Sequence, residues 1–309
     1  ADKALAVGVG LMLAVREYIS YSGPGMLSPR GRCFTFNESA DGFGRGEGCG
    51  SLVMRSSDED ADTEGMLACL VGSAVNQDGR SASMTAPHGP SQQMCIRASM
   101  QELELQAKEI TMAECHGTGT ALGDPIEVGA VRAVMADKQS APREAPLLNT
   151  SAKTHIGHLE AAAGMAGVIK CVLSVVNSTG PPNAHLQTLN PHMDTTGYPA
   201  CFVNEPSDYS IGSSIAGVSS FGFGGTNARG DIWGRCLGGP RRTSELFTGS
   251  VYQQRLAFYD RVEENGSPGP QESDEVFVVG SWDARGELWP MERGDLGEYS
   301  VTAHRREEG

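Results

Sequence analysis

The chain has 309 residues, of which 39% are hydrophobic, a composition typical of a folded protein with a substantial core. Its formal net charge of −14 at pH 7 excludes binding to nucleic acid through a broadly basic surface, but leaves room for a local basic patch that binds an acidic carrier. No run reaches eighteen apolar residues, so the sequence does not predict a membrane span.

The cysteines and the first residues point to a cellular context. The eight cysteines form no CxxC pair and no cluster with histidine at zinc spacing, so we predict no metal site. We interpret them as free thiols in a reducing, intracellular compartment, either the cytoplasm or a plastid. Residues 1–13 resemble the end of one element followed by a buried strand, without a signal-peptide pattern. We therefore expect the chain to begin in the middle of a domain.

The first predicted elements after this strand are two further strands and a helix. Short runs rich in Val and Leu at 50–54 and 66–75 predict buried strands joined by a loop. The segment 91–105 predicts an amphipathic helix, because its apolar residues recur near helical spacing: Met94, Ile96, Met100 and Leu103.

Two more helices follow. Residues 124–138 predict a helix with Asp124 as its N-cap and Pro125 as its first residue. Residues 158–178 predict a helix that is apolar nearly all round and rich in Ala and Gly, as expected for a helix buried against other backbones. The segment 216–228 then begins as a strand and ends in a glycine loop. Strands that alternate with buried helices predict an α/β layered fold.

The character of the sequence changes after residue 236. Residues 1–236 form the predicted α/β domain. Residues 237–274 read as a helical linker, with an amphipathic segment followed by a run rich in Gly, Pro and Ser. Residues 275–309 read as short strands with turns, and predict a small all-β tail.

A candidate catalytic histidine lies in the motif ECHGTGTALGDPIE, residues 114–127. Small neighbours leave room for a ligand to approach His116 closely, and histidine is the commonest general acid or base. Thr118 and Thr120 supply hydroxyls that could hold an extended polar ligand. A structural loop histidine is the alternative.

A second candidate pair lies in KTHIGHLEAAAG, residues 153–164. His158 is at the expected N-terminus of a buried helix, where the helix dipole favours a neutral imidazole. Lys153 precedes it in a turn, and the two residues together suit stabilisation of an anion. The alternative is that Lys153 is a solvated turn residue.

Two glycine-rich segments remain. In FGFGGTN, residues 221–227, glycines flank Phe223, so a backbone N–H could point into a cavity as an oxyanion hole requires and the ring could act as a gate; a plain glycine turn is the alternative. GFGRGEG, residues 42–48, is only a weak dinucleotide-binding motif, because it lacks a clean GxGxxG pattern.

Taken in order, these motifs resemble the β-ketoacyl synthase (ketosynthase) domain of type I modular polyketide synthases over about residues 1–228. The segments that carry the resemblance are TFNESADGFGRGEGCG, VGSAVNQDGRSASMTAPHGPSQ, ECHGTGTALGDPIE, SAKTHIGHLEAAAGMAGVIK, PPNAHLQTLNP and AGVSSFGFGGTNA. The resemblance implies a thiolase-like five-layered αβαβα sandwich with an incomplete first half. It also implies a homodimer when the fold is complete.

The resemblance further implies decarboxylative Claisen condensation of a malonyl unit with an acyl thioester, both presented by the phosphopantetheine arm of an acyl carrier protein, with no cofactor bound directly. Its catalytic residues match His116, His158 and Lys153, and its arm-binding residues match Thr118 and Thr120. Phe223 matches a gate whose backbone N–H helps to form the oxyanion hole. Asp124 and Glu127 match acidic positions that orient the loop, although helix capping explains them equally well.

The family's nucleophilic cysteine has no match in this chain. Its DTACSSS-type motif is absent, and neither Cys33, Cys49 nor Cys115 occupies its position. We therefore expect an N-terminally truncated fragment that is inactive in condensation and exposes a large apolar face. A decayed condensing domain used for dimerisation or for carrier or glycan binding is the non-catalytic alternative, and a fatty-acid synthase condensing domain shares the same site.

Two smaller features depart from the family. After GGTNA the sequence reads RGDIWGRC in place of a His and an apolar strand, which predicts the loss of part of the last strand. The segment from about residue 275 faintly resembles a starch-binding β-sandwich, in which Trp282 and Trp289 would stack on sugars; two tryptophans anchoring a small β core is the alternative.

Overall fold

A computed structural model describes residues 3–56, 66–79, 86–102, 104–136, 143, 145–208, 212–236, 277–278, 289–290, 292–293 and 299–300. Contacts divide the chain into two units, 1–243 and 244–309. The first unit carries the predicted α/β elements. The amphipathic and linker segments expected at 237–274 lie outside the described residues, as do Leu103 and Trp282.

A six-stranded mixed sheet forms the centre of the first unit, in the order β3–β10–β9–β4–β5–β7. Its strands are β3 (Cys69–Gln77), β10 (Thr226–Arg235), β9 (Ser213–Phe221), β4 (Ile110–Glu114), β5 (Leu147–Thr150) and β7 (Ala200–Phe202). β10 runs antiparallel to β3 and β9, whereas β9, β4, β5 and β7 run parallel to one another. The four parallel strands therefore end at the same edge of the sheet.

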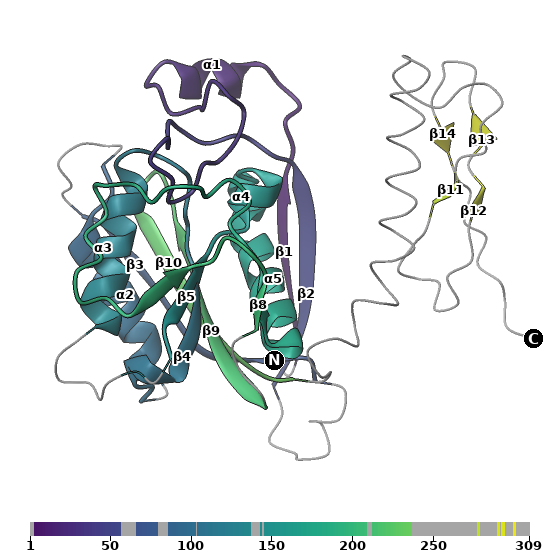
Figure 1. Cartoon of the computed structure of the whole chain (residues 1–309). Helices are drawn as coiled ribbons and strands as arrows, with labels where there is room; N and C mark the ends of the chain where they lie inside the picture. Colours follow the sequence, from purple (N-terminus) through teal and green to yellow (C-terminus); the bar gives the residue numbers. More distant parts are fainter. Residues whose placement is uncertain are drawn as a thin grey trace, which may run out of the picture. The chain divides into compact units, whose positions relative to one another are not determined.

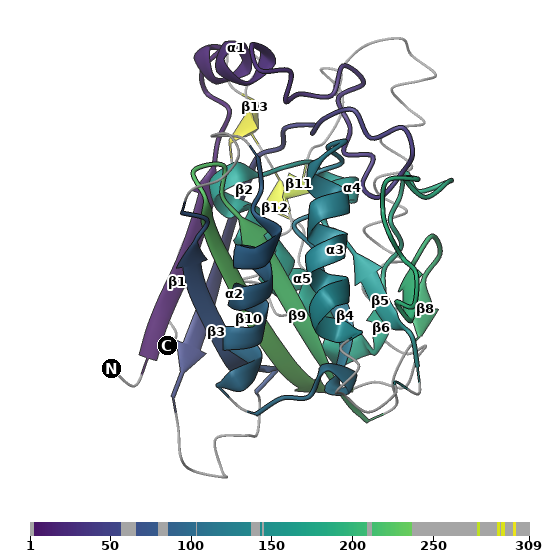
Figure 2. The same ribbon diagram turned by 90° about the vertical axis from the view of Figure 1, so that its left-hand side faces the viewer.

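Helices cover both faces of this sheet (Figures 1 and 2). α2 (Gly89–Gln101) and α3 (Gly123–Met135) pack on one face, and α5 (Ala163–Asn177) packs on the other against β9 and β10. Each face has its own buried cluster, the first around Ile96, Ile110 and Val131 and the second around Met112, Val175 and Ala216.

The other side of α5 is covered by a second, two-stranded antiparallel sheet of β1 (Lys3–Gly10) and β2 (Gly48–Arg55) (Figure 1). The backbones approach very closely here: a Cβ atom at Gly10 would lie 2.2 Å from the carbonyl oxygen of Leu159. The described layers therefore follow the order helix, sheet, helix, sheet, which confirms the predicted thiolase-like order without its fifth layer among the described residues.

The apolar character of the segment Glu160–Asn177 follows from this position. By length and composition alone it could span a membrane, with a mean hydropathy of 1.3. In the structure it forms the 3₁₀ turn η3 (Glu160–Ala162) and α5, and sheets pack on two of its sides. Its hydropathy is thus that of a central core helix, but the expected single helix from His158 is wrong in its first turns.

The remaining described elements are short. α1 (Arg16–Ser22), η2 (Ala107–Glu109) and α4 (Lys153–Ile156) are helical turns, and β6 (Thr179–Gly180) pairs with β8 (Ser207–Asp208). In the second unit, β11 (Phe277–Val278) pairs with β12 (Trp289–Pro290), and β13 (Glu292–Arg293) pairs with β14 (Tyr299–Ser300). These strands agree with the β character expected of the tail.

Several expectations about individual elements are wrong. The three strands expected to be buried are covered on one side only, and Val53 and Val75 are 80% and 72% exposed.

The segment RGDIWGRC does not shorten the last strand, because β10 continues to Arg235 in register with β9. Two charged residues of this strand, Arg229 and Asp231, form an ion pair at 2.8 Å in the core, which satisfies both charges.

The expected buried face of α2 is also wrong in part. Met94 is 57% exposed, and the buried stripe runs through Cys95 and Ile96.

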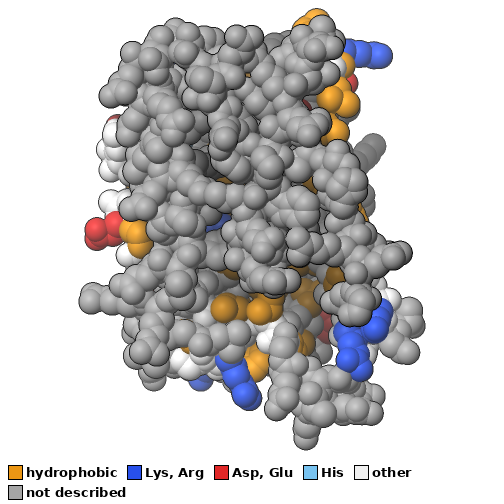
Figure 3. Space-filling model, turned by 90° about the vertical axis from the view of Figure 1, so that its right-hand side faces the viewer, with side chains coloured by type: hydrophobic (Ala, Val, Ile, Leu, Met, Phe, Trp, Pro, Cys, Tyr) orange, Lys and Arg blue, Asp and Glu red, His pale blue; other side chains and the backbone are white. Residues whose placement is uncertain are grey.

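The apolar face expected of the first half is present. Alternate residues of β1 and β2 point away from α5, so that Leu5 lies opposite Val53, and Val9 opposite Cys49. Large hydrophobic residues are exposed on and beside this sheet: Leu5, Val7, Val9, Leu11, Leu13 and Val53. Hydrophobic side chains are among the described residues in view on this side of the molecule (Figure 3).

Candidate active site

The candidate residues meet at the edge where the parallel strands end. β4 ends at Glu114 and leads into the loop of His116, and β5 ends at Thr150 and leads into α4 and His158. β9 ends at Phe221, directly before the glycine loop. Because β9, β4 and β5 are adjacent and parallel, three segments far apart in the sequence are brought to one place.

Two carboxylates hold the His116 loop in shape. Glu127 accepts the backbone N–H groups of His116 at 2.6 Å and Gly117 at 2.8 Å. Asp124 accepts those of Gly119 at 3.1 Å and Phe36 at 2.8 Å. Burial raises the pKa of both carboxyl groups, that of Asp124 to about 6, while these N–H donors act in the opposite direction. Both acids therefore orient the loop.

The prediction that Asp124 caps α3 is wrong. The N-cap position belongs to Leu122, and no side chain caps the helix there. Asp124 lies in the first turn, and its carboxylate is directed instead to the backbone of two loops.

His116 is held as a neutral imidazole with a defined tautomer. Its Nδ1 accepts the backbone N–H of Phe221 at 3.2 Å, so the proton of the neutral ring is on Nε2. Burial, the charge of Lys153 and the nearby His158 all lower its pKa well below the usual value. His116 can therefore donate a hydrogen bond at neutral pH without carrying a charge.

His158 has the same arrangement. Its Nδ1 accepts the backbone N–H of Glu160 at 2.9 Å, which again places the ring proton on Nε2. Burial lowers its pKa to about 3, with further contributions from Lys153 and Arg45. The expected cause, a helix dipole, is wrong: the residue precedes a 3₁₀ turn, and burial and nearby cations account for the neutral ring.

The two imidazoles lie close together. Their ring centroids are 5.4 Å apart, and their planes are nearly perpendicular at 82°. Both line a cavity of about 320 Å³, together with Thr118, Thr120 and Phe223. The structure thus brings together the two histidines, both threonines and the phenylalanine that the sequence singled out.

Lys153 is not a solvated turn residue. It begins α4, and only 6% of it is exposed. Burial lowers its pKa, whereas the carboxylates of Glu114 and Glu127 raise it. Lys153 is not among the described lining residues of the cavity, so its geometry favours an electrostatic role behind the two histidines.

The threonines and the phenylalanine differ in how firmly they are held. The hydroxyls of Thr118 and Thr120 are 3.1 Å apart, and Thr120 Oγ1 accepts the N–H of Gly123 at 3.1 Å. Phe223 is 48% exposed between two glycines. An exposed ring beside the cavity agrees with a gate, and that role stays a prediction.

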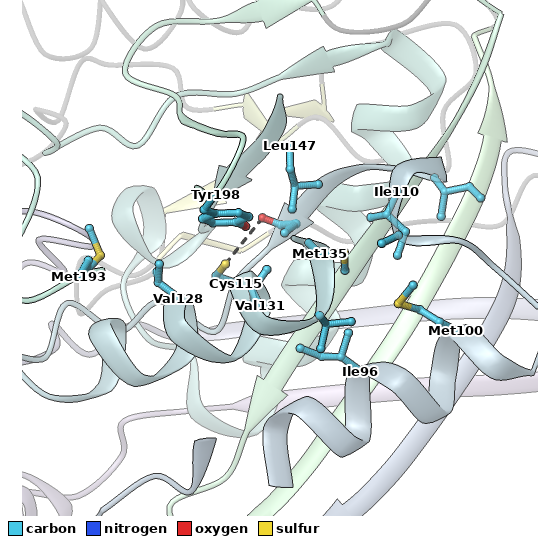
Figure 4. Close-up of a cluster of buried hydrophobic side chains, with 14 of the residues drawn as sticks. Ile96, Met100, Ile110, Cys115, Val128, Val131, Met135, Leu147, Met193 and Tyr198 are labelled. Atoms are coloured by element: carbon cyan, nitrogen blue, oxygen red, sulfur yellow. Dashed lines mark hydrogen bonds between the residues drawn. The ribbon is translucent and has the colours of Figure 1, made fainter. Parts of the chain in front are cut away.

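No cysteine is among the described residues that line the cavity. The thiol of Cys115 lies in the hydrophobic core beside Tyr198 (Figure 4). It donates a hydrogen bond to the carbonyl oxygen of Ala113 at 3.8 Å. Burial raises the pKa of Cys115 well above its usual value and that of Cys33 to about 11. Both thiols are therefore poor nucleophiles, and neither faces the histidines' cavity.

The glycine-rich segment 42–48 has a role that the sequence did not reveal. It runs directly against the His158 segment: His158 N–H donates to Gly44 O at 2.7 Å, and Gly46 N–H donates to His158 O at 3.0 Å. A Cβ atom at Gly46 would lie 2.3 Å from the carbonyl oxygen of Ile156. The glycines permit this close approach, which fixes the backbone on both sides of His158.

Arg45 and Glu114 are buried charged residues near the two histidines that the sequence analysis did not single out. Arg45 binds Glu160 at 2.6 Å beside His158. Glu114 accepts hydrogen bonds from Ala152 N–H at 2.5 Å and Thr150 Oγ1 at 2.7 Å, and pairs with Lys170 at 2.7 Å. The only available signal for Glu114 was its place directly before the Cys-His pair.

The described residues contain no group of His, Cys, Asp and Glu side chains that could hold a metal ion.

Comparisons with family profiles and with known proteins agree with the family that the motifs resemble. The profile of the β-ketoacyl synthase C-terminal domain matches residues 67–187, and that of the N-terminal domain matches residues 1–60. A phenolphthiocerol/phthiocerol polyketide synthase of Mycobacterium tuberculosis is 45% identical over 228 residues, which are 73% of this chain and 12% of that protein. Mycoketide-CoA synthase of the same organism is 44% identical over 230 residues, 74% of this chain and 6% of that protein.

The solved structures agree. A ketosynthase from module 6 of the bacillaene synthase of Bacillus subtilis 168 superposes with a TM-score of 0.70 and 33% identity, covering 87% of this chain and 49% of that one. An oxazolomycin ketosynthase domain of Streptomyces albus also gives a TM-score of 0.70, with 29% identity over 76% of this chain and 42% of that one. The chain thus spans about half of these solved ketosynthases and a small part of the curated synthases.

Proposed function

Because this chain belongs to the β-ketoacyl synthase family, in its polyketide synthase branch, we propose that it forms part of an enzyme that joins a malonyl unit to an acyl thioester with loss of carbon dioxide. The observation that carries the proposal is the pair of neutral imidazoles that meet at one cavity. Each ring has its Nδ1 occupied by a backbone N–H, so each has an Nε2–H available to a ligand.

These two donors suit the decarboxylation of a malonyl thioester. The bond between the carboxylate and the α-carbon breaks, carbon dioxide leaves, and the electron pair passes into the thioester to form an enolate. Hydrogen bonds from His116 and His158 to the enolate oxygen stabilise the charge as it develops, and preorganised donors of this kind typically contribute a few kcal/mol each. Lys153 adds a positive charge behind them.

The condensation that follows requires an acyl thioester on a cysteine. The enolate carbon would attack the carbonyl carbon, and the tetrahedral oxyanion would be held by backbone N–H groups such as that of Phe223. The described cavity supplies no such cysteine, so the part of the reaction that these residues support by themselves is decarboxylation.

The substrates would be presented by an acyl carrier protein. Thr118 and Thr120 offer hydroxyls beside the histidines for the phosphopantetheine arm, which acts as the carrier of both thioesters. The complete enzyme would act as a homodimer, as the family resemblance implies.

The test is decarboxylation of the malonyl thioester of N-acetylcysteamine by the purified chain. We expect carbon dioxide and the acetyl thioester in equal amounts, with one proton taken up. His116→Ala and His158→Ala should each slow the reaction about 10²- to 10³-fold, the usual effect of losing one preorganised donor. His155→Ala is the matched control, because this exposed histidine is not among the described lining residues.

Equal rates for the wild-type chain and both histidine variants would contradict the proposal. Binding of the thioester without decarboxylation would favour the non-catalytic, carrier-binding alternative.

A further inference from the structure

Gln92, near the start of α2, has a buried side chain without a hydrogen-bond partner. Only 2% of the residue is exposed, and its Oε1 atom accepts no hydrogen bond from any described residue. Its backbone N–H is satisfied by His88 O at 3.2 Å. A buried carbonyl oxygen without a donor is destabilising, and such atoms are uncommon in folded proteins.

Gln92 also lines the cavity of the two histidines. Of the described side chains that line this cavity, only Gln92 has a buried polar atom without a hydrogen-bond partner. The side-chain amide of Asn227, in the same lining, donates to Asp78 Oδ1 at 2.7 Å and to Asn76 Oδ1 at 3.0 Å. Gln92 therefore has a buried acceptor left for a ligand. A ligand that brings an N–H group to this wall would satisfy the buried oxygen.

We propose that Gln92 Oε1 accepts a hydrogen bond from an amide N–H of the pantetheine arm. The inference rests on the proposed function and adds a residue to the surface that reads the arm. Thr118 and Thr120 line the same cavity, but their hydroxyls are already close to each other, and Thr120 Oγ1 also accepts the N–H of Gly123. The arm contains secondary amides, and Gln92 offers their N–H groups a separate acceptor.

This contact would make Gln92 a specificity-determining residue. A thioester with an amide in its thiol portion would satisfy the oxygen, whereas one without an amide N–H would bury the oxygen unpaired. Sites with a buried polar group reject ligands that lack the matching partner more strongly than apolar pockets reject a change in size.

The experiment compares two ligands that differ at one group. Acetyl-S-N-acetylcysteamine contains the amide, and its ester analogue has oxygen in place of the N–H. Dissociation constants are measured by calorimetry for the whole chain, for Gln92→Leu, and for Gln101→Leu as a matched control, because Gln101 is an exposed glutamine at the end of the same helix.

We expect the wild type and Gln101→Leu to bind the amide about tenfold more tightly than the ester, in line with the loss of one hydrogen bond to a buried group. Gln92→Leu should bind the two ligands equally. Gln92→Met is the second variant, with a flexible apolar chain of similar length that keeps the helix packed.

A preference for the amide that persists in both Gln92 variants would overturn the inference, as would a wild type that does not distinguish the ligands. A wild type that binds neither ligand would overturn the proposed function itself, so the two failures are distinguishable.

Discussion

β9 and β1 are strands of similar length with opposite surroundings. Six consecutive residues of β9 are buried, because helices cover both faces of its sheet. β1 has no fully buried residue, and alternate apolar side chains point away from α5. The difference shows that apolar residues in a strand indicate a need for a packing layer on each apolar face. They do not show whether the same chain supplies both layers.

The largest effect that sharpens this comparison concerns two valines. Val218 in β9 is 6% exposed, and Val53 on the outer face of β2 is 80% exposed. Val218→Asp places an unpaired carboxylate in the core and should cost more than about 4 kcal/mol of the free energy of unfolding. Val53→Asp should change it by less than about 0.5 kcal/mol. Urea unfolding of both variants measures the difference.

Equal losses in the two variants would break the comparison. They would mean that the outer face of β1 and β2 is covered in solution.

The next largest effect concerns the buried ion pair between Glu114, at the end of β4, and Lys170 in α5. Glu114→Gln leaves Lys170 buried without its counter-charge and should cost about 3–5 kcal/mol. The double variant Glu114→Gln, Lys170→Met removes both charges and should recover a large part of this loss. The control is Asp194→Asn, which breaks an exposed ion pair with Arg132 and should have a much smaller effect, because solvent screens this pair. A loss of the same size in the control, measured by urea unfolding, would contradict the assignment.

The last prediction concerns the protonation of His158. Its pKa of about 3 lies below the usual value near 6.5, so between these pH values the unfolded chain binds a proton that the folded chain does not. This group alone lowers the free energy of unfolding by about 1.4 kcal/mol per unit as the pH falls through that window. Asp124 acts in the opposite direction between its usual value and about 6, because its raised pKa makes the folded chain the better proton acceptor.

Since these contributions partly cancel in stability measurements, the ring itself is the better probe. We expect the NMR shift of the His158 ring to stay constant from pH 8 to pH 5 in the native chain. In urea the same signal should titrate near pH 6.5. A native midpoint near 6.5 would show that the ring is not buried beside Lys153.

Much of the site could be predicted from the sequence, because its residues lie in short motifs that determine their own loops. His116, His158, Thr118, Thr120 and Phe223 all line one cavity, as the motifs indicated. The helices were also predictable from their spacing, although α2 turns Met94 outward because the side chains of β3 and β10 select its buried face.

The remainder depends on contacts between distant segments, which local patterns do not contain. The neutral state of His158 comes from burial beside Lys153 and Arg45, and the direction of the Asp124 carboxylate comes from the backbone of Phe36. The continuation of β10 through Arg229 was unexpected, because a charged strand residue is buried only where a partner such as Asp231 is in place.

The contact between Phe221 and His116 has a consequence for when the candidate site forms during folding. The two residues are 105 positions apart, so their hydrogen bond forms only after β9 has docked beside β4. Closing such a long loop is slow, and non-local pairings of this kind form late in folding. A partly folded chain would have ordinary, solvated histidines that take up protons in mildly acidic solution. Recovery of the neutral His116 signal during refolding would therefore mark the moment at which the last strands of the sheet come together.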